Sequence, residues 1–374
     1  MDFELSSEQT LLKDSIDRFV LDKYDFDSRQ KLARGATGYS EDNWKMMAEM
    51  GWLALPFSED VGGFGGTPVE TAILMESFGT GLVLEPYLAS ILLGGKLIEL
   101  AGSDEQKEAI LAPLIEGEHL LSVGYAEPQS RFDLHDVATG ATKAGDTYKL
   151  SGHKTMALNA ATANTLIVSA RTSGERRDEA GISLFLVDAQ ASGLTLKNYA
   201  TLDGGRASDV ILDGAEATLL GAEGEGLSYL NQVIDHAICA ICAEAVGAIA
   251  KVNEVTLDYA KTRVQFEKSI GANQVIQHRL ADMLIEEEMS RTMSAMASMR
   301  LIAEPEQRGA IASATKARVN EAAVYVGEQG IQVHGGIGMT DEYIVGHYYK
   351  RLMVIEKLFG PTDFHHQRYA ELAE

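Results

Sequence analysis

Three long alanine-rich segments near the C-terminus constrain the fold more than any other feature of the sequence. Residues 228–262, 272–302 and 306–329 have helical character and are largely free of proline, and Pro305 marks the break between the last two. Long helices joined by short links are typical of a helical bundle. We therefore predict that the chain from about residue 225 onward folds as a bundle.

The N-terminal region is also predicted to be helical. Ser6 and Gln9 form a capping-box pattern that precedes apolar residues at helical spacing. Between the expected helices, the glycine-rich run 61–66 is predicted to be a loop. The further helical segments are expected at residues 41–51, 67–79, 86–101 and 104–116.

The middle of the chain is rich in β-forming residues. Short apolar runs there are separated by turn sequences such as Ala144-Gly145-Asp146, which is typical of a small sandwich or barrel. The clearest runs are residues 148–150, 165–169, 182–187 and 210–212. The predicted fold is α+β and multidomain: an N-terminal α-helical domain (1–118), a middle β-domain (119–224) and a C-terminal α-helical bundle (225–374).

Charge and composition narrow the range of partners. The chain has 32 basic and 55 acidic residues, a formal net charge of −23, so nucleic acid is not an expected ligand. Residues 1–5 lack the basic and apolar regions of a secretory signal. No uninterrupted apolar run reaches the ~18 residues that span a bilayer. We expect a cytoplasmic protein that does not insert into a membrane.

Several common catalytic and metal-binding patterns are missing from the sequence. It contains neither G-x-S-x-G nor H-E-x-x-H. Cys239 and Cys242 lie in an apolar run without a second cysteine pair, which favours a buried helix over a zinc or redox site. We interpret His365 and His366 as a solvated pair in the tail. No metal site is predicted.

Distributed short motifs carry more information than any single one. They are Tyr125-Ala126-Glu127-Pro128, Gly152-His153-Lys154, Arg206-Ala207-Ser208-Asp209, Arg263-Val264-Gln265-Phe266 and the segment from Ile331 to Tyr343. In this order, across nearly the whole chain, they resemble the acyl-CoA dehydrogenase family. The stretch Ala126–Arg131 and the ending Gly346–Leu352 are most similar to the small subunits of pimeloyl-CoA dehydrogenase-type enzymes.

The resemblance implies a fold, a cofactor and a reaction. It implies a C-terminal four-helix bundle and an FAD that binds between the β-domain and the bundle, with its adenine half reaching a neighbouring subunit. The implied reaction is α,β-dehydrogenation of an acyl-CoA thioester, in which a carboxylate removes the α-proton and the flavin takes the β-hydride. An electron-transfer flavoprotein or a similar acceptor would reoxidise the flavin.

The family's catalytic glutamate is absent from both positions where it usually stands. By resemblance, one position falls on Phe359 and the other on Ala237, and the arginine beside the latter falls on Ile238. Asp235 is the best replacement, with an alternative role in contacting the substrate. The weaker candidates are His236, Glu244, Glu356 and Asp363. Ile238 would also face the substrate.

The residues expected at the flavin ring are altered too. By resemblance, Ala126 replaces a threonine, while Met156 and Leu158 replace an aromatic and a hydroxyl residue that cover the ring. Backbone amides could take over the lost hydroxyl contacts. Arg131 and Lys154 are candidates for meeting the negative charge of CoA.

The residues expected at the adenine half are retained. The resemblance assigns contacts with a neighbour's FAD to Arg263, Phe266, Gln274, Gln332, Gly335 and Gly336. The pattern is asymmetric, and it predicts one subunit of a heteromeric enzyme, with an α2β2 assembly favoured, whose partner supplies the glutamate. Two alternatives remain: a self-sufficient homomer with Asp235 as base, and a non-catalytic homologue that binds a CoA ester or a partner.

Overall fold

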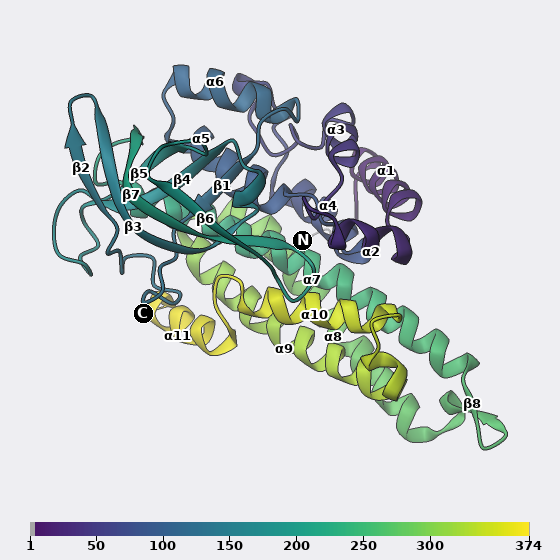
Figure 1. The fold of residues 1–374 in the computed structure, drawn as a ribbon. Coiled ribbons are helices and arrows are strands. Elements are labelled where there is room, and N and C mark those ends of the chain that lie inside the picture. Colours follow the sequence, from purple (N-terminus) through teal and green to yellow (C-terminus); the bar gives the residue numbers. More distant parts are fainter. Residues whose placement is uncertain (1–3, 374) are drawn as a thin grey trace. The chain divides into compact units, whose positions relative to one another are not determined.

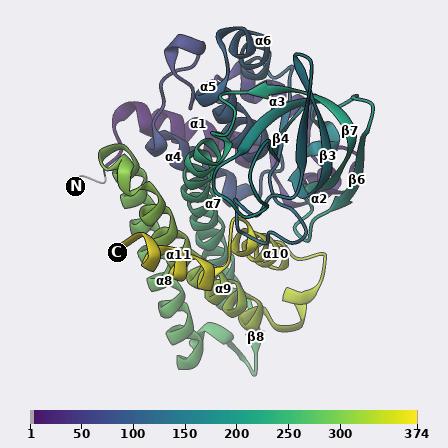
Figure 2. The ribbon, with the colours of Figure 1, turned by 90° about the vertical axis from the view of Figure 1, so that its left-hand side faces the viewer.

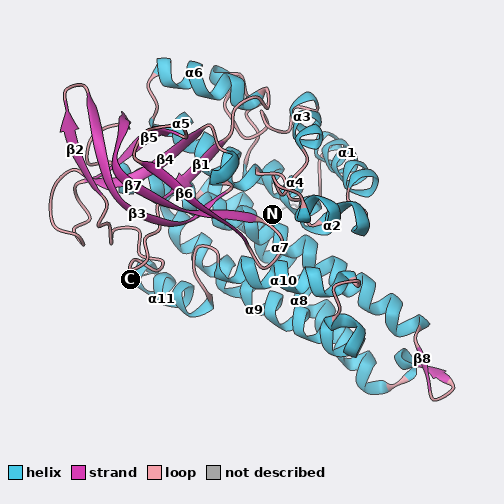
Figure 3. Ribbon diagram, viewed as in Figure 1, coloured by secondary structure: helices cyan, strands magenta, loops and turns pink. Residues whose placement is uncertain are grey.

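The computed structural model describes residues 4–373, which divide into two compact units (Figures 1 and 3). The first unit contains the chain up to Lys31, Thr67–Val83 and everything from Ile238 onward. The second contains Leu32–Gly66 and Leu84–Ala237. Helices dominate the first unit, and a β-sheet with short helices forms the second. This confirms the predicted α+β multidomain fold class, with helices at both ends of the chain and strands between them; the predicted domain boundaries stay a prediction.

The helices predicted at the N-terminus and at residues 67–79, 228–262, 272–302 and 306–329 lie close to the predicted positions, whereas those at residues 26–34, 344–357 and 362–373 were not predicted individually. Ser6 caps the first of them through the predicted capping box with Gln9. The helices are α1 (Ser7–Lys23), α2 (Phe26–Arg34, which ends in the second unit), α4 (Pro68–Gly81), α7 (Gly226–Thr262, which begins in the second unit), α8 (Gln274–Ala303), α9 (Arg308–His334), α10 (Ile344–Lys357) and α11 (Thr362–Ala373). Short 3-10 turns lie at Ile270–Ala272, Pro305–Gln307 and Gly335–Met339.

Side chains of α7 contact α8 and the end of α9. Asn253 donates hydrogen bonds to Met283 O and to Glu287 of α8. Tyr259 stacks on His334 at the end of α9, with ring centroids 4.4 Å apart. Because α9 also packs against both α8 and α10, the four helices form the predicted bundle.

Two glycines allow α4 and α7 to cross at backbone contact. A Cβ on Gly79 would lie 1.9 Å from Glu244 O, and a Cβ on Gly247 would lie 1.9 Å from Glu76 O. Both distances are too short for any side chain. The crossing therefore requires glycine on both helices.

The second unit contains a mixed β-sheet that closes on itself. Its strands are β1 (Leu121–Gly124), β2 (Gly140–Ala144), β3 (Thr147–Leu158), β4 (Thr165–Arg171), β5 (Ile182–Asp188), β6 (Leu194–Ala200) and β7 (Arg206–Leu220). Hydrogen-bonded pairing runs β4–β2–β3–β7–β5 and returns from β5 to β4, while β1 and β6 pair with β4 and β7. The sheet is thus a small barrel, one of the two architectures that the short strands predicted. Figure 2 shows its curvature.

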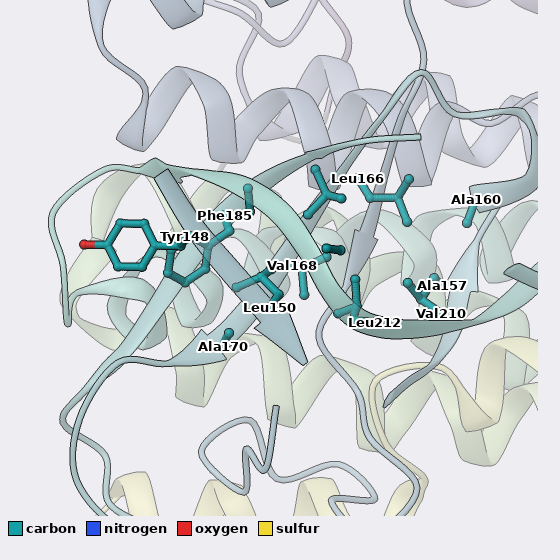
Figure 4. Packing of buried hydrophobic residues seen from close by; sticks show 13 residues of the cluster. Tyr148, Leu150, Ala157, Ala160, Leu166, Val168, Ala170, Phe185, Val210 and Leu212 are labelled. Atoms are coloured by element: carbon teal, nitrogen blue, oxygen red, sulfur yellow. The ribbon is translucent and has the colours of Figure 1, made fainter. Parts of the chain in front are cut away.

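The barrel encloses a continuous apolar core, shown in Figure 4. Leu166 and Val168 of β4 face Phe185 of β5, and Val210 of β7 closes the other side; all four side chains are fully buried. Alternate residues of each strand point inward, which leaves an outer face for other contacts. The remaining helices of this unit are α3 (Glu41–Glu49), α5 (Lys96–Ala101) and α6 (Asp104–Ile115), with 3-10 turns at Glu59–Val61 and Ala160–Thr162.

Three features differ from the predictions. Residues 86–101 are helical as predicted, but Tyr87–Gly95 is a π-helix, followed by α5. The interpretation of His365 as solvated is wrong. Its side chain is fully buried in α11, and burial lowers its pKa to about 3. The last turn of α9 includes Gln332–His334, which were expected to follow the helix.

The apolar character of α7 is explained by its burial in the protein core. This helix is long and apolar enough to cross a membrane, but 89% of its most apolar window is buried inside the protein. Cys239 and Cys242 lie within it as buried residues, as the sequence predicted. Burial raises the pKa of Cys242 to about 12, so this thiol stays protonated.

Candidate functional site

A short hairpin projects from the bundle between α7 and α8 (Figure 1). Its strands are β8 (Val264–Gln265) and β9 (Lys268–Ser269), and its tip carries Phe266, which is 95% exposed. Phe266 and Glu267 have φ angles of 52° and 66°, left-handed conformations that glycine and asparagine adopt more readily. An exposed aromatic ring on a strained turn is poorly explained by the stability of the chain alone.

The glycines after α9 lie at the same end of the first unit as the hairpin. The stack of Tyr259 on His334 joins the last turns of α7 and α9, and Arg263 follows Tyr259 by one turn. A Cβ on Gly335 or Gly336 would meet no atom within 4 Å, so the backbone there is open to a ligand or a partner.

The candidate adenine-side residues are all exposed at this end. They are Arg263, Phe266, Gln274, Gln332, Gly335 and Gly336. His334 is buried beneath the glycines: it is hydrogen-bonded through Nδ1 to Gly330 O at 2.8 Å, and burial lowers its pKa. A neutral, stacked histidine therefore holds the segment that leads into Gly335.

In the second unit, the loop after β1 is fixed by a buried ion pair. Lys154 Nζ lies 2.6 Å from Glu127 Oε1, with both side chains essentially inaccessible to solvent. Glu127 also accepts hydrogen bonds from Gln129 and from the backbone of Ala138 and Thr139. Lys154 is thus a structural partner of Glu127 here, which leaves no free ammonium for the CoA contact considered above.

The charges of this pair shift both pKa values. Burial opposes the ionised form of Glu127, but the charge and hydrogen bond of Lys154 and the other donors outweigh it and lower the carboxyl pKa to about 2. Burial lowers the pKa of Lys154 to about 8, against the attraction of Glu127. Near neutral pH both groups remain ionised and paired.

The candidate flavin-ring residues lie on and beside a bulge in β3. Met156 is 40% exposed with a φ of 55°, and Leu158 lies two residues further along the strand. The Thr155 N–H donates to Ala126 O at 2.8 Å, and the Met156 N–H donates to the Tyr199 hydroxyl at 3.2 Å. These two amides are already satisfied by the protein and are not available as substitutes for the lost hydroxyl contacts.

Arg131 is an exposed residue of the loop after β1, with a φ of 51°. Nearby, Asp136 is held by Arg176 and Arg177, and the hydrogen bond from Arg176 leads the causes that lower the Asp136 pKa to about 2. Arg171 donates to six backbone carbonyls of residues 135–180. The loop is rigidly held, and Arg131 remains a candidate for an anionic part of the substrate.

The two expected base positions carry buried side chains without a carboxylate. Ala237 is 1% exposed and Phe359 is 8% exposed, the latter with a φ of 60°. Asp235 and Ala237 belong to the second unit, whereas Ile238 and Phe359 belong to the first. The two expected base positions, Ala237 and Phe359, therefore belong to different units. Asp235 and Ile238 are both buried in α7, at 2% and 1% exposure.

Other candidate carboxylates are already engaged within the first unit. Glu244 accepts two hydrogen bonds from Arg351, at 2.6 and 2.7 Å. Glu356 pairs with Lys357 at 2.8 Å. Because Arg351 occupies both carboxylate oxygens, Glu244 is a poor substitute for the missing glutamate.

A lysine that was not among the predicted site residues fixes the segment around Phe359. Lys316 is fully buried in α9, and its Nζ donates to Asn320 Oδ1 at 2.6 Å and to Ile355 O at 2.7 Å. It also reaches Gly360 O at 3.5 Å. A lysine inside an alanine-rich helix gives a usable signal, because such a residue is rarely buried without partners.

The candidate residues suit the adenosine and pyrophosphate part of FAD better than its ring. The exposed guanidinium of Arg263, the ring of Phe266 and the open backbone at Gly335 suit the adenosine and pyrophosphate part of a dinucleotide. At the ring side, the amides of Thr155 and Met156 already donate within the protein, and the side chains of Ala126, Met156 and Leu158 carry no hydroxyl. Among the residues that the structure describes, no cluster of histidine, cysteine and carboxylate side chains suits a metal ion.

Comparisons with known proteins agree with this combination of helical region, barrel and bundle. Residues 6–118 match the profile "Acyl-CoA dehydrogenase, N-terminal domain", residues 122–214 match "Acyl-CoA dehydrogenase, middle domain", and residues 224–372 match "Acyl-CoA dehydrogenase, C-terminal domain". The architecture is that of a flavoprotein oxidoreductase acting on acyl-CoA. The chain belongs to the acyl-CoA dehydrogenase family, whose members are FAD-dependent.

Individual relatives span nearly the whole chain. "Probable acyl-CoA dehydrogenase YngJ" of Bacillus subtilis (strain 168) is 32% identical over 356 residues, 92% of each chain. "Caffeyl-CoA reductase-Etf complex subunit CarC" of Acetobacterium woodii is 29% identical and covers 85% of each chain. A solved variant of the "Tcur3481-Tcur3483 steroid ACAD" superposes with a TM-score of 0.88 at 26% identity, covering 98% of this chain and 97% of that one.

Proposed function

We propose that this chain is one subunit of a heteromeric acyl-CoA dehydrogenase, with α2β2 as the favoured assembly. The enzyme would dehydrogenate an acyl-CoA thioester between its α and β carbons, and the partner subunit would supply the catalytic glutamate. The observation that carries this proposal is the uneven state of the site. The adenine-side residues are exposed to solvent, where a ligand can reach them. Both base positions, Phe359 and Ala237, hold buried side chains that cannot accept a proton.

The chain's own residues would act mainly by binding and positioning. Arg263 would pair with a phosphate oxygen of the partner's dinucleotide, and Phe266 would cover its apolar surface. Gln332 and the open backbone at Gly335 and Gly336 would contact the adenosine end. The FAD held by these residues would supply the acceptor for the hydride of the β-carbon. The α-proton would go to a carboxylate outside this chain.

Within its own barrel the chain would contribute apolar walls. Met156 and Leu158 can pack against a ring or an acyl group, and Ala126 leaves room beside them. Arg131 would meet a negative group of the CoA moiety. Buried Asp235 and Ile238 of α7 would border the substrate. Leucine, methionine and alanine exclude water without donating hydrogen bonds, which suits a surface that closes a site whose chemistry lies elsewhere.

The names of relatives favour an assembly with other proteins. One relative is named as a subunit of a reductase–Etf complex, and the name of one solved relative joins two chains and calls the protein a steroid ACAD. We propose an electron-transfer flavoprotein or similar protein as the acceptor, a cytoplasmic location, and an acyl group that is dicarboxylic, branched or bulky. Small residues Ala237 and Ala240 on α7 favour the bulky alternative.

The decisive experiment compares FAD content alone and in the assembly. The chain is purified alone and with its natural partner, captured through a tag in the source cells, and FAD is quantified per chain from the absorbance after denaturation. We expect little FAD and negligible turnover from the isolated chain, and both to appear with the partner. Near-stoichiometric FAD and robust turnover of the isolated chain would refute the heteromeric proposal.

The variant Asp235→Asn separates a base in this chain from one in the partner. If the partner supplies the base, the assembly with Asp235→Asn should retain turnover within about tenfold of wild type, since only a substrate contact changes. A loss of several orders of magnitude at unchanged FAD content would instead assign the base to Asp235 and support the homomeric alternative. An assembly that never takes up FAD would favour the non-catalytic alternative.

A further inference from the structure

The bulge in β3 is defined by its register against β7. Lys154 pairs with Val210 and Ala157 pairs with Ser208, so Thr155 and Met156 together oppose a single residue, Asp209. Two residues facing one is the arrangement of a β-bulge, which redirects side chains at functional sites. The redirected side chain is that of Met156.

The backbone of Met156 is strained and must be held. Its φ of 55° lies in the left-handed region, which is unfavourable for a residue with a Cβ. Two hydrogen bonds fix the bulge: one from the Thr155 N–H to Ala126 O, and one from the Met156 N–H to the hydroxyl oxygen of Tyr199. The second bond reaches Met156 from β6, on the opposite side of β7.

Asp209 sets the direction of the Tyr199 hydroxyl. The hydroxyl donates its proton to Asp209 Oδ1 at 3.2 Å, which leaves its oxygen lone pairs for the Met156 N–H. His153 Nε2 lies 3.6 Å from the other carboxylate oxygen of Asp209. Asp209, which lies opposite the bulge, and Tyr199, which holds it, therefore belong to one hydrogen-bonded chain.

These groups share the outer face of the barrel. Val210 and Leu212 of β7 point into the core, so Ala207 and Asp209 point outward. Tyr199 and Leu158 both pair with Ala207 and lie on the same outer face. The candidate cofactor residues Met156 and Leu158 thus lie on the face where Tyr199 and Asp209 form their contacts.

We propose that Tyr199 and Asp209 are positioning residues that hold the β3 bulge and thereby present Met156 to the flavin side of the site. The inference rests on the proposed function, because it takes Met156 as a cofactor-facing residue. Tyr199 would touch no reacting atom. It would act through the Met156 backbone, and its removal should loosen the bulge and weaken cofactor binding together.

The test uses two matched tyrosine-to-phenylalanine variants of the full chain. Tyr199→Phe removes the hydroxyl that holds Met156. Tyr148→Phe removes a hydroxyl at the other end of β3 that donates to Glu223 at 2.8 Å. Amide hydrogen exchange is measured by mass spectrometry on peptides covering residues 154–158, and FAD affinity is measured by flavin fluorescence in the assembly with the partner.

We expect exchange at the bulge to be about tenfold faster, and FAD affinity about tenfold weaker, in Tyr199→Phe than in wild type, as for the loss of one hydrogen bond. Tyr148→Phe should match wild type in both. Asp209→Asn, which keeps an oxygen acceptor for the hydroxyl, should fall between wild type and Asp209→Ala. A merely structural role would lower thermal stability without changing the exchange of this one segment.

The outcomes separate the two proposals. Unchanged bulge exchange or unchanged FAD affinity in Tyr199→Phe, with a wild-type assembly that binds FAD, would overturn the positioning role alone. A wild-type assembly that takes up no FAD would overturn the proposed function and, with it, the cofactor role of Tyr199. Equal effects of Tyr148→Phe and Tyr199→Phe would also overturn the inference, because they would show a general response of the barrel.

Discussion

At the scale of single residues, the most consequential contact in the barrel is the ion pair of Glu127 with Lys154. Both side chains are buried, and the pair joins the loop after β1 to the middle of β3. A buried pair contributes little net stability compared with apolar residues, but breaking it by removing one partner is costly. Its role is to specify where the loop lies.

This pair leads to a prediction on stability. Glu127→Gln should destabilise the chain by about 3–5 kcal/mol, because it leaves the Lys154 ammonium buried without a counter-charge. The double variant Glu127→Gln with Lys154→Met should recover a large part of this loss. Urea unfolding monitored by circular dichroism measures both, and equal losses in the single and double variants would contradict the argument.

The pH dependence of the pair follows from the lowered carboxyl pKa. Because the Glu127 pKa is about 2 in the folded chain and 4.5 as the reference value, its contribution is fully present above pH 4.5 and is lost as the pH falls toward 2. The melting temperature of the wild type should therefore fall as the pH is lowered from 4.5 toward 2. The fall should be smaller in the double variant, and an identical pH dependence of the two melting temperatures would argue against this role of the ion pair.

At the scale of secondary structure elements, the β8–β9 hairpin combines local strain with exposure. Its turn uses Phe266 and Glu267 at positive φ, where Asn-Gly would be unstrained. A turn optimised for stability would use different residues. This choice is consistent with a hairpin that is kept for its contacts with a partner.

Replacing the turn with Phe266→Asn and Glu267→Gly should separate stability from binding. We expect the melting temperature of the isolated chain to be unchanged or raised by a few degrees, as strain of about 1–2 kcal/mol is relieved. FAD content of the assembly should fall. Calorimetry and flavin absorbance measure the two effects, and full FAD content in the double variant would exclude a role for Phe266.

The elements show how far the sequence could be interpreted. The long helices and the apolar strands were predictable, because their periodicity reflects one buried face or a buried core. The hairpin and the edge strand β6 were missed, since their exposed residues lack such a pattern. The β3 bulge was also out of reach: a register shift depends on partners such as Tyr199 and Asp209, which are distant in sequence or in another strand.

At the scale of the whole molecule, α8 and the hairpin before it carry several exposed large apolar side chains. The exposed apolar residues on or near this helix are Val264, Phe266, Val275, Leu284, Ile285 and Met289. Clustered exposed apolar side chains mark interaction surfaces. This agrees with the family's oligomeric relatives and with the proposed assembly.

Ile285→Glu should therefore weaken the assembly without unfolding the chain. Ile285 is 54% exposed, so a charge there is tolerated in the free chain but is unfavourable in an apolar interface. Light scattering after chromatography should show a shift to smaller species with an unchanged far-ultraviolet spectrum. Leu21→Glu, at an 80% exposed site on α1, serves as the control; equal shifts in both variants would remove α8 from the interface.

The glycine crossing of α4 and α7 has a consequence for how this sequence can vary. Any mutation of Gly79 or Gly247 adds a Cβ, and at both positions that atom would collide with a backbone oxygen of the opposite helix. No repacking of side chains relieves such a collision; only separation of the two helices does. Random mutagenesis with selection for folded protein should therefore recover glycine at both sites, including in libraries where most of the surrounding apolar residues have drifted.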